Sequence, residues 1–169
     1  KIEKFRAMEE YKKCDKDALK WAEKYRKKDK NKEFFDNYAD FWSDLNTMAG
    51  ESGVNFYEEG AKGYSKAKQT FDAMTGYYPE NPGPWLMLAL CQYNTNLAKE
   101  GELSMKSFQT AMTNAGDISA LPEDQKKLLK AAMMHYATYK DTKGDKSAGK
   151  AILDQGKDAF IADADFKTF

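Results

Sequence analysis

β-branched aliphatic residues are almost absent from this chain of 169 residues, and their scarcity constrains the fold more than any other feature. Valine occurs once, at Val54, and isoleucine occurs only four times, whereas alanine, leucine, lysine and methionine are plentiful. Strands are enriched in β-branched residues, and unbranched side chains favour helices. We therefore expect a single all-α domain of about seven helices.

The overall composition argues against several classes of partner. Lysine plus arginine and aspartate plus glutamate both total 27, so the net charge is zero, whereas duplex-binding proteins normally carry a basic excess. We expect no nucleic-acid partner. The longest apolar segment, Trp85 to Cys91, is too short to cross a bilayer, so we expect a soluble chain without a membrane span. The first residue is Lys1, which fits a targeting peptide lost on export or organelle import and fits a trimmed terminus equally well.

Prolines and glycines place the helix boundaries. Residues 78–85 read Tyr-Pro-Glu-Asn-Pro-Gly-Pro-Trp, and proline is tolerated in the first turn of a helix but costs ~3 kcal/mol in its interior. One helix therefore ends and another begins in this segment. Together with the spacing of apolar residues, glycine-rich turns predict helices over about 2–28, 31–50, 84–98, 102–114, 123–141 and 145–160. From Val54 to Met74 the apolar spacing fits either one long helix or a hairpin of two short ones, and repeat logic favours the hairpin. We expect Gly50 to Gly53 to end the second helix, Gly60 to Gly63 to turn a hairpin, and Gly101 to separate the helices on either side of it.

Pairs of a small and a large residue recur at helical spacing, as in Ala67 and Phe71 and again in Ser104 and Phe108. In this respect the chain resembles the tetratricopeptide repeat (TPR) family, whose unit is a 34-residue antiparallel helix pair. The residues that carry the resemblance are Ala67, Phe71, Met74 and Pro79, then Trp85, Leu88, Ala89, Ser104, Phe108 and Ala111, and in a degenerate third unit Met133, Tyr136, Ala137, Gly149, Leu153 and Gly156. The resemblance covers about residues 48–161 and implies a short right-handed solenoid of stacked hairpins. Residues 1–47 are then expected to form a helical hairpin cap, and residues 162–169 a tail.

The resemblance also implies a binding groove along the first helices of the repeats. The residues it places in this groove are Phe56, Leu86, Leu90, Tyr93, Asn94, Met134 and Thr138. Since the set is largely apolar and aromatic, it favours an apolar helix or segment of a partner protein. The expected function is an interaction scaffold or a small structural subunit of a larger assembly. The alternative is a small-molecule binding module with a helical-repeat pocket, such as a transporter-associated periplasmic component.

A further alternative concerns the occupant of the groove. The chain's own N-terminal helix, or its tail from Ile161 to Phe169, would fill the groove as readily as a partner. Phe166 and Phe169 are the candidate anchors of the tail. The basic run from Lys24 to Lys32 also has two interpretations, an anionic-surface patch or cations favoured at a helix C-terminus, and we favour the second.

No spacing in the chain predicts an active site or a metal site. His135 is the only histidine, so neither a catalytic triad nor an H-E-x-x-H zinc site can be built from it alone. Cys14 and Cys91 lie in separate expected helices and form no C-x-x-C motif. The segment from Asp141 to Asp145 has Lys143 where a calcium loop needs an oxygen ligand. We expect no enzymatic activity, no cofactor and no metal.

Overall fold

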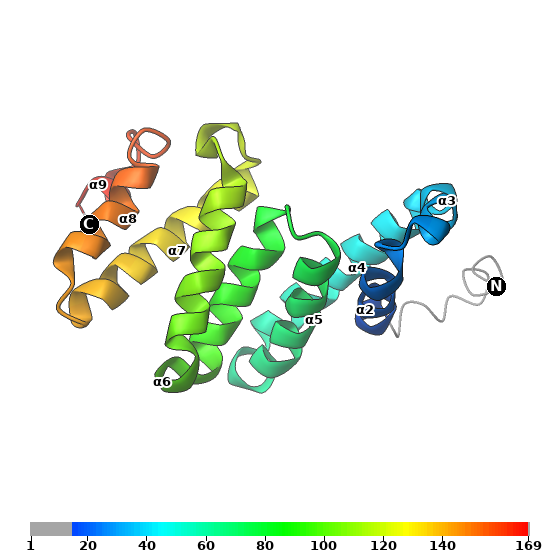
Figure 1. Ribbon diagram of the computed structural model, residues 1–169. Helices are drawn as coiled ribbons and strands as arrows, with labels where there is room; N and C mark the ends of the chain where they lie inside the picture. The colour runs from blue at the N-terminus through cyan, green and yellow to red at the C-terminus, as the bar shows by residue number, and fades with distance from the viewer. Residues whose placement is uncertain (1–14, 169) are drawn as a thin grey trace.

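A computed structural model describes residues 15–168, and every regular element among them is helical (Figure 1). The elements are α2 (Asp15–Arg26), η2 (Asp29–Asn31), α3 (Lys32–Asn37), α4 (Ala39–Glu58), η3 (Gly60–Lys62), α5 (Tyr64–Tyr77), α6 (Pro82–Ala115), η4 (Ile118–Ala120), α7 (Glu123–Thr142), α8 (Lys146–Gly156) and α9 (Ala164–Thr168). The all-α prediction is confirmed for these residues. The start of the helix expected over 2–28 lies outside them.

The helices succeed one another along the molecule in chain order, from α2 and α3 at one end to α8 and α9 at the other (Figure 1). α2 packs on α4 and α5, α5 also packs on α6, and α7 packs on α6 and α8. The small and large residues of the repeated pairs lie in these contacts, since Ala67, Phe71, Ser104 and Phe108 are all buried. Each hairpin therefore buries its apolar face mainly against its neighbours in the chain.

The prediction that Gly50 to Gly53 end a helix is wrong, because α4 continues through them to Glu58. A side chain at Gly53 would come within 2.7 Å of the Phe71 ring of α5, so this glycine permits close helix packing. The turn follows at Gly60, which has a φ of +68° that favours glycine. The hairpin turn expected at Gly60 to Gly63 is thus confirmed, but its first helix begins at Ala39, and the expected boundary between residues 47 and 48 falls inside α4.

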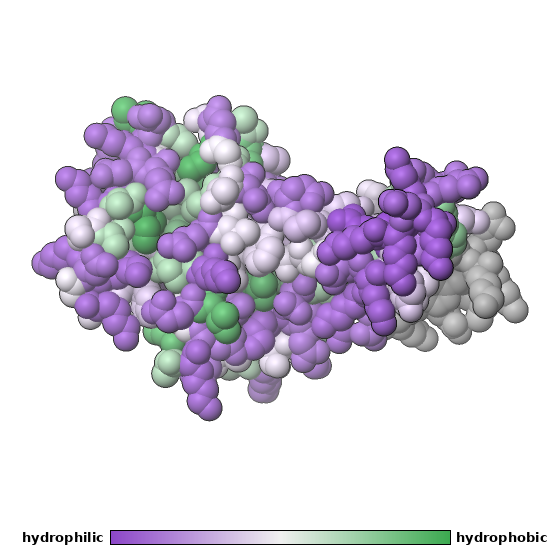
Figure 2. Space-filling model, in the orientation of Figure 1, coloured by the Kyte–Doolittle hydropathy of each residue, from purple (hydrophilic) through white to green (hydrophobic). Residues whose placement is uncertain are grey.

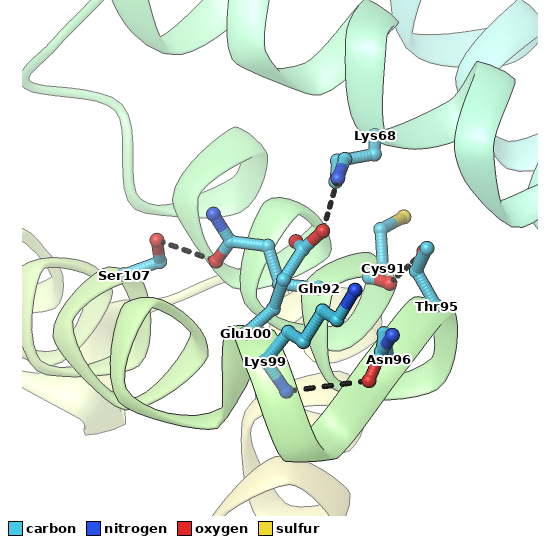
Figure 3. A network of polar contacts seen from close by, with 8 residues as sticks. All are labelled: Lys68, Cys91, Gln92, Thr95, Asn96, Lys99, Glu100 and Ser107. Carbon is cyan, nitrogen blue, oxygen red and sulfur yellow. Dashed lines mark hydrogen bonds and ion pairs between the residues drawn. The ribbon is translucent and has the colours of Figure 1, made fainter.

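α6 folds back on itself at Asn96, which has an extended φ of −164° and a ψ of 86°. The side chain of Asn96 accepts a hydrogen bond from the backbone N–H of Lys99 at 3.2 Å, which caps the second half of α6 (Figure 3). The two halves are joined by the hydroxyl of Ser107, which donates to Gln92 Oε1 at 2.9 Å. An ion pair of 2.5 Å between Lys68 and Glu100 ties this hairpin to α5 (Figure 3).

The two helices expected over about 84–98 and 102–114 are therefore present, but the break between them lies at Asn96 and not at Gly101, which is inside the second half of α6. A Cβ atom at this position would stand 2.7 Å from the hydroxyl oxygen of Tyr139 in α7. Gly101 thus permits the close approach of α7. Asn96 suits the break because its short amide can cap the helix that follows directly, by accepting from the backbone N–H three residues later.

α7 runs close to the expected range, whereas α8 ends at Gly156, short of the expected residue 160. Both glycines of α8 face α7 closely: a Cβ at Gly149 would lie 2.9 Å from the Ala137 carbonyl oxygen, and one at Gly156 would lie 2.7 Å from Met133 Cε. These contacts leave no room at either position for the alanine that the resemblance to TPR proteins would lead one to expect.

Candidate functional site

The residues expected in the groove divide into two groups. Leu86 and Leu90 are only 4% and 8% exposed, so their side chains belong to the core and offer a partner almost no surface. Phe56, Tyr93 and Met134 are partly exposed, and Asn94 and Thr138 are exposed. Leu86 and Leu90 lie eight and four residues before Asn94 on α6. They turn inward because α6 packs against both α5 and α7. The accessible members of the set lie on α4, the first half of α6, and α7.

Two side-chain contacts connect these three helices, and we call the four residues that make them the aromatic band: Tyr57, Tyr93, Asn94 and His135. Asn94 Nδ2 donates a hydrogen bond to the Tyr57 hydroxyl at 3.1 Å, which joins α6 to α4. The ring of Tyr93 meets the ring of His135 edge-on at a centroid distance of 3.8 Å, which joins α6 to α7. Tyr93 and Asn94 are adjacent in sequence, so the two contacts are linked through the backbone of α6.

Two titratable groups of the aromatic band, Tyr57 and His135, are held in their uncharged forms. Burial raises the pKa of the Tyr57 hydroxyl, the neighbouring Tyr64 adds to this shift, and the hydrogen bond from Asn94 opposes it. Burial lowers the pKa of His135, because a partly buried imidazolium loses hydration. Its Nε2 atom is buried and has no hydrogen-bond partner in the described part of the chain. Tyr57 and His135 are therefore neutral near pH 7.

A buried polar contact beneath the aromatic band joins α7 to the α6 hairpin. The Ser104 hydroxyl donates to the Ala89 carbonyl at 2.8 Å, and the Tyr136 hydroxyl contacts Ser104 Oγ. The Tyr136 ring is fully buried and stacks on Phe108 at 4.4 Å and 22°. Burial raises the pKa of Tyr136, and the hydrogen bond with Ser104 opposes this shift. Since His135 precedes Tyr136, this contact also positions His135 in the band.

The sequence pattern marked Tyr93 and Asn94 but not the other two members of the band. Tyr57 was not among the expected groove residues, and His135 drew notice only as the single histidine. The missing information is pairing: no periodicity shows that Tyr57 reaches Asn94, 37 residues later, or that Tyr93 meets His135. The Gly60 to Gly63 turn was the available signal for the contact between Tyr57 and Asn94. It brings the end of α4 next to α5, which in turn packs on α6.

The described parts of both termini pack away from the aromatic band. α2 lies against α4 and α5, and the buried Phe166 of α9 contacts Phe160 at 5.1 Å. Asp163 holds this tail, since it pairs with Lys130 at 2.5 Å and accepts a hydrogen bond from the Phe166 N–H at 3.0 Å. Phe169, the other expected anchor, lies outside the described residues.

Within residues 15–168, no helix combines the length and the apolarity that crossing a membrane requires. In the same part of the chain, no three His, Cys, Asp or Glu side chains gather as a metal site. Cys91 is a free, buried thiol whose pKa burial raises to about 12.

Comparison with known proteins adds no relative to these observations. No protein-family model, curated protein or solved structure matches the chain. The resemblance to TPR proteins therefore depends on the repeat-spaced residues alone.

Proposed function

We propose that this protein is a TPR-like interaction scaffold that docks an apolar helix or segment of a partner protein across the aromatic band. One observation carries the proposal: two adjacent residues of α6 reach the helices on either side, since Asn94 bonds to Tyr57 of α4 and Tyr93 meets His135 of α7. A segment that lies along these residues meets three helices at once. The role is binding rather than catalysis, and the protein acts as an adaptor or as a small subunit of an assembly.

The chemistry of the surface favours an apolar occupant. Tyrosine is enriched among the residues that dominate binding energy at interfaces, because it offers a large rigid ring and few rotatable bonds. Burying apolar area contributes about 25 cal/mol per Å². Phe56 and Met134 add partly exposed apolar surface on α4 and α7. A charged segment would gain little here, because Tyr57 and His135 are neutral and offer no ion pair.

The proposal is tested by photo-crosslinking from the edge of the band. A benzoylphenylalanine residue at Thr138, which is exposed on α7, is activated in cells that make the protein, and the captured segment is identified by mass spectrometry. The matched control carries the same group at Ser147, which is exposed on α8. The captured segment is then synthesised and its affinity for the purified protein is measured by fluorescence anisotropy.

We expect the segment to be apolar and to bind with its affinity reduced about tenfold by Met134→Lys, a change of about 1.4 kcal/mol. Ser147→Lys should leave the affinity unchanged. Equal capture from both positions, or a segment whose affinity is the same for Met134→Lys and for Ser147→Lys, would refute docking at the aromatic band.

A further inference from the structure

An open cavity of about 380 Å³ lies at the α2–α3 end of the molecule, between α2, α3, α4 and α5, and we call it the α2–α5 pocket. Small-molecule sites have volumes of about 300–1,000 Å³, so the cavity has the size of a ligand site. In Figure 2, hydrophilic residues crowd the surface over α2 and α3. The pocket is distinct from the aromatic band, because no residue of the band lines it.

The lining of the pocket carries an excess of positive charge. Three cations, Arg26, Lys27 and Lys32, face one carboxylate, Asp36. Neither Arg26 nor Lys32 has an ion-pair partner among the described residues. Lys27 pairs with Glu23 at 3.6 Å, but both side chains are more than a third exposed, so the pair is weak and can be exchanged.

Arg26 is one of only two arginines in the chain, and aromatic rings hold its guanidinium in place. The guanidinium lies 4.4 Å from the centre of the Tyr77 ring and 5.7 Å from that of Tyr78. Stacking of this kind fixes the planar group; one of its N–H groups bonds to the Tyr77 hydroxyl, and the others can donate to a further acceptor. An arginine without a carboxylate partner, placed in this way at a cavity, suits a carboxylate or phosphate oxygen pair.

The rest of the lining is aromatic. The rings of Phe35 and Trp42 lie 5.2 Å apart, and those of Trp42 and Tyr77 lie 6.2 Å apart. Trp42 is 4% exposed, and its indole N–H is buried without a hydrogen-bond partner in the part of the chain that the structure describes. Burial, with a smaller contribution from Tyr78, raises the pKa of Tyr77 to about 12, so its hydroxyl remains a neutral group beside the cations.

We propose that the α2–α5 pocket binds a small organic anion with a flat aromatic body. The anionic group pairs with Arg26 and Lys32, and the ring packs over Ala39 and the partly exposed Tyr78. Phe35, Trp42 and Tyr77 form the floor of the pocket beneath them, since they are only 8%, 4% and 4% exposed. Stacked or edge-on aromatic contacts contribute about 0.5–1.5 kcal/mol beyond area burial, and the charged hydrogen bonds orient the ligand. The site also gives the basic run from Lys24 to Lys32 a role beyond favouring a helix C-terminus, since three of its cations line one cavity.

The test uses 2-naphthoate as the probe and isothermal titration calorimetry on the full chain. We expect one site for 2-naphthoate, and affinity at least about tenfold lower for neutral 2-naphthylmethanol, which has the same ring without the charge. Arg26→Gln and Lys32→Gln should each weaken 2-naphthoate several-fold. Lys157→Gln, at an exposed lysine after α8, should not. Lys32→Gln replaces the charge of an exposed side chain that forms no ion pair with the described residues, so it should not disturb folding. It therefore keeps the test valid if Arg26→Gln impairs folding.

Equal affinity for the naphthoate and the alcohol, or unchanged naphthoate affinity in Lys32→Gln, would overturn the proposal. An acidic peptide without aromatic residues that binds as tightly as 2-naphthoate would overturn the need for an aromatic body. The outcome is separate from that at the aromatic band, because Met134→Lys should leave naphthoate binding unchanged while it weakens the partner segment.

Discussion

Gly63, at the turn between α4 and α5, is the position where a single methyl group should harm the fold most. A Cβ atom there would lie 1.7 Å from the Phe56 carbonyl oxygen and 2.7 Å from its carbon, whereas real Cβ atoms essentially never approach another atom within 3.0 Å. The obstacle is backbone, which cannot rotate away as a side chain does. Gly63→Ala therefore forces the turn to open by roughly 1.3 Å, the difference between 3.0 and 1.7 Å.

The expected cost follows from this displacement. Overpacking of a tightly packed site typically costs about 1–3 kcal/mol, and replacing glycine by alanine returns about 0.4–1 kcal/mol by restricting the unfolded chain. Because the clash is with backbone, we expect a net loss of about 2 kcal/mol. For a chain of this length that lowers the melting temperature by about 4–8 °C. Urea unfolding followed by circular dichroism measures the free energy, and calorimetry measures the melting temperature.

Gly50→Ala is the matched control, because Gly50 lies inside α4 and the nearest atom to its Cβ would be Met74 Cε at 3.5 Å, an ordinary contact. Without a clash, the higher helix propensity of alanine should stabilise the protein by up to about 1 kcal/mol. The two variants should therefore shift stability in opposite directions. If Gly63→Ala is as stable as Gly50→Ala, the close approach of Gly63 to Phe56 is refuted, and with it the α4–α5 turn that positions Tyr57.

Three further predictions concern the buried groups. Ser104→Ala should lower the free energy of unfolding in urea by about 1–3 kcal/mol, because it leaves the buried Tyr136 hydroxyl unpaired. Tyr136→Phe should lower it less, because Ser104 keeps its bond to a backbone carbonyl. The reverse order of the two losses would contradict the geometry. In a Cys14→Ser variant, Cys91 should react with a disulfide reagent at pH 8 only as fast as the protein unfolds locally, because burial raises the pKa of its thiol to about 12. Rapid labelling of the folded protein would show an accessible thiolate instead. Because burial lowers the pKa of His135 below 6.5, the unfolded chain binds more protons than the folded one at acidic pH. The contribution of His135 to the free energy of unfolding is therefore fully present above pH 6.5 and should be lost as the pH drops to 5.5. His135→Gln should reduce this dependence of stability on pH, and an unchanged dependence would show that His135 is fully hydrated in the fold.

The helices themselves followed from local sequence, because periodicity and punctuation act over a few residues. Prolines 79, 82 and 84 marked the boundary between α5 and α6, and the glycines at 60 and 63 marked the α4–α5 turn. The other glycine assignments failed for one reason. Gly53 and Gly101 have the residue type of a helix end, yet each lies in a helix interior where a neighbouring helix comes too close for a side chain. That neighbour is distant in sequence, so the pattern cannot distinguish a breaker from a contact.

The exposure of the expected groove residues shows the same limit. Leu86, Leu90 and Asn94 share one helix and one spacing, and only the packing of α6 between α5 and α7 makes the first two core residues and the third a surface residue. Trp85, one of the residues that carry the TPR resemblance, is partly exposed and donates its indole N–H to the Pro79 carbonyl at 2.7 Å, so it holds the turn as well as the core.

The sequence by itself determined that the chain is helical, where most helices begin and end, and which small and large residues pair within the core. Local propensities and periodicity carry that information. The tertiary structure alone decided that Tyr57, Tyr93, Asn94 and His135 form one surface, and that Arg26 and Lys32 line an aromatic cavity. Both arrangements join side chains from different helices, and their proximity depends on how closely glycines let those helices approach.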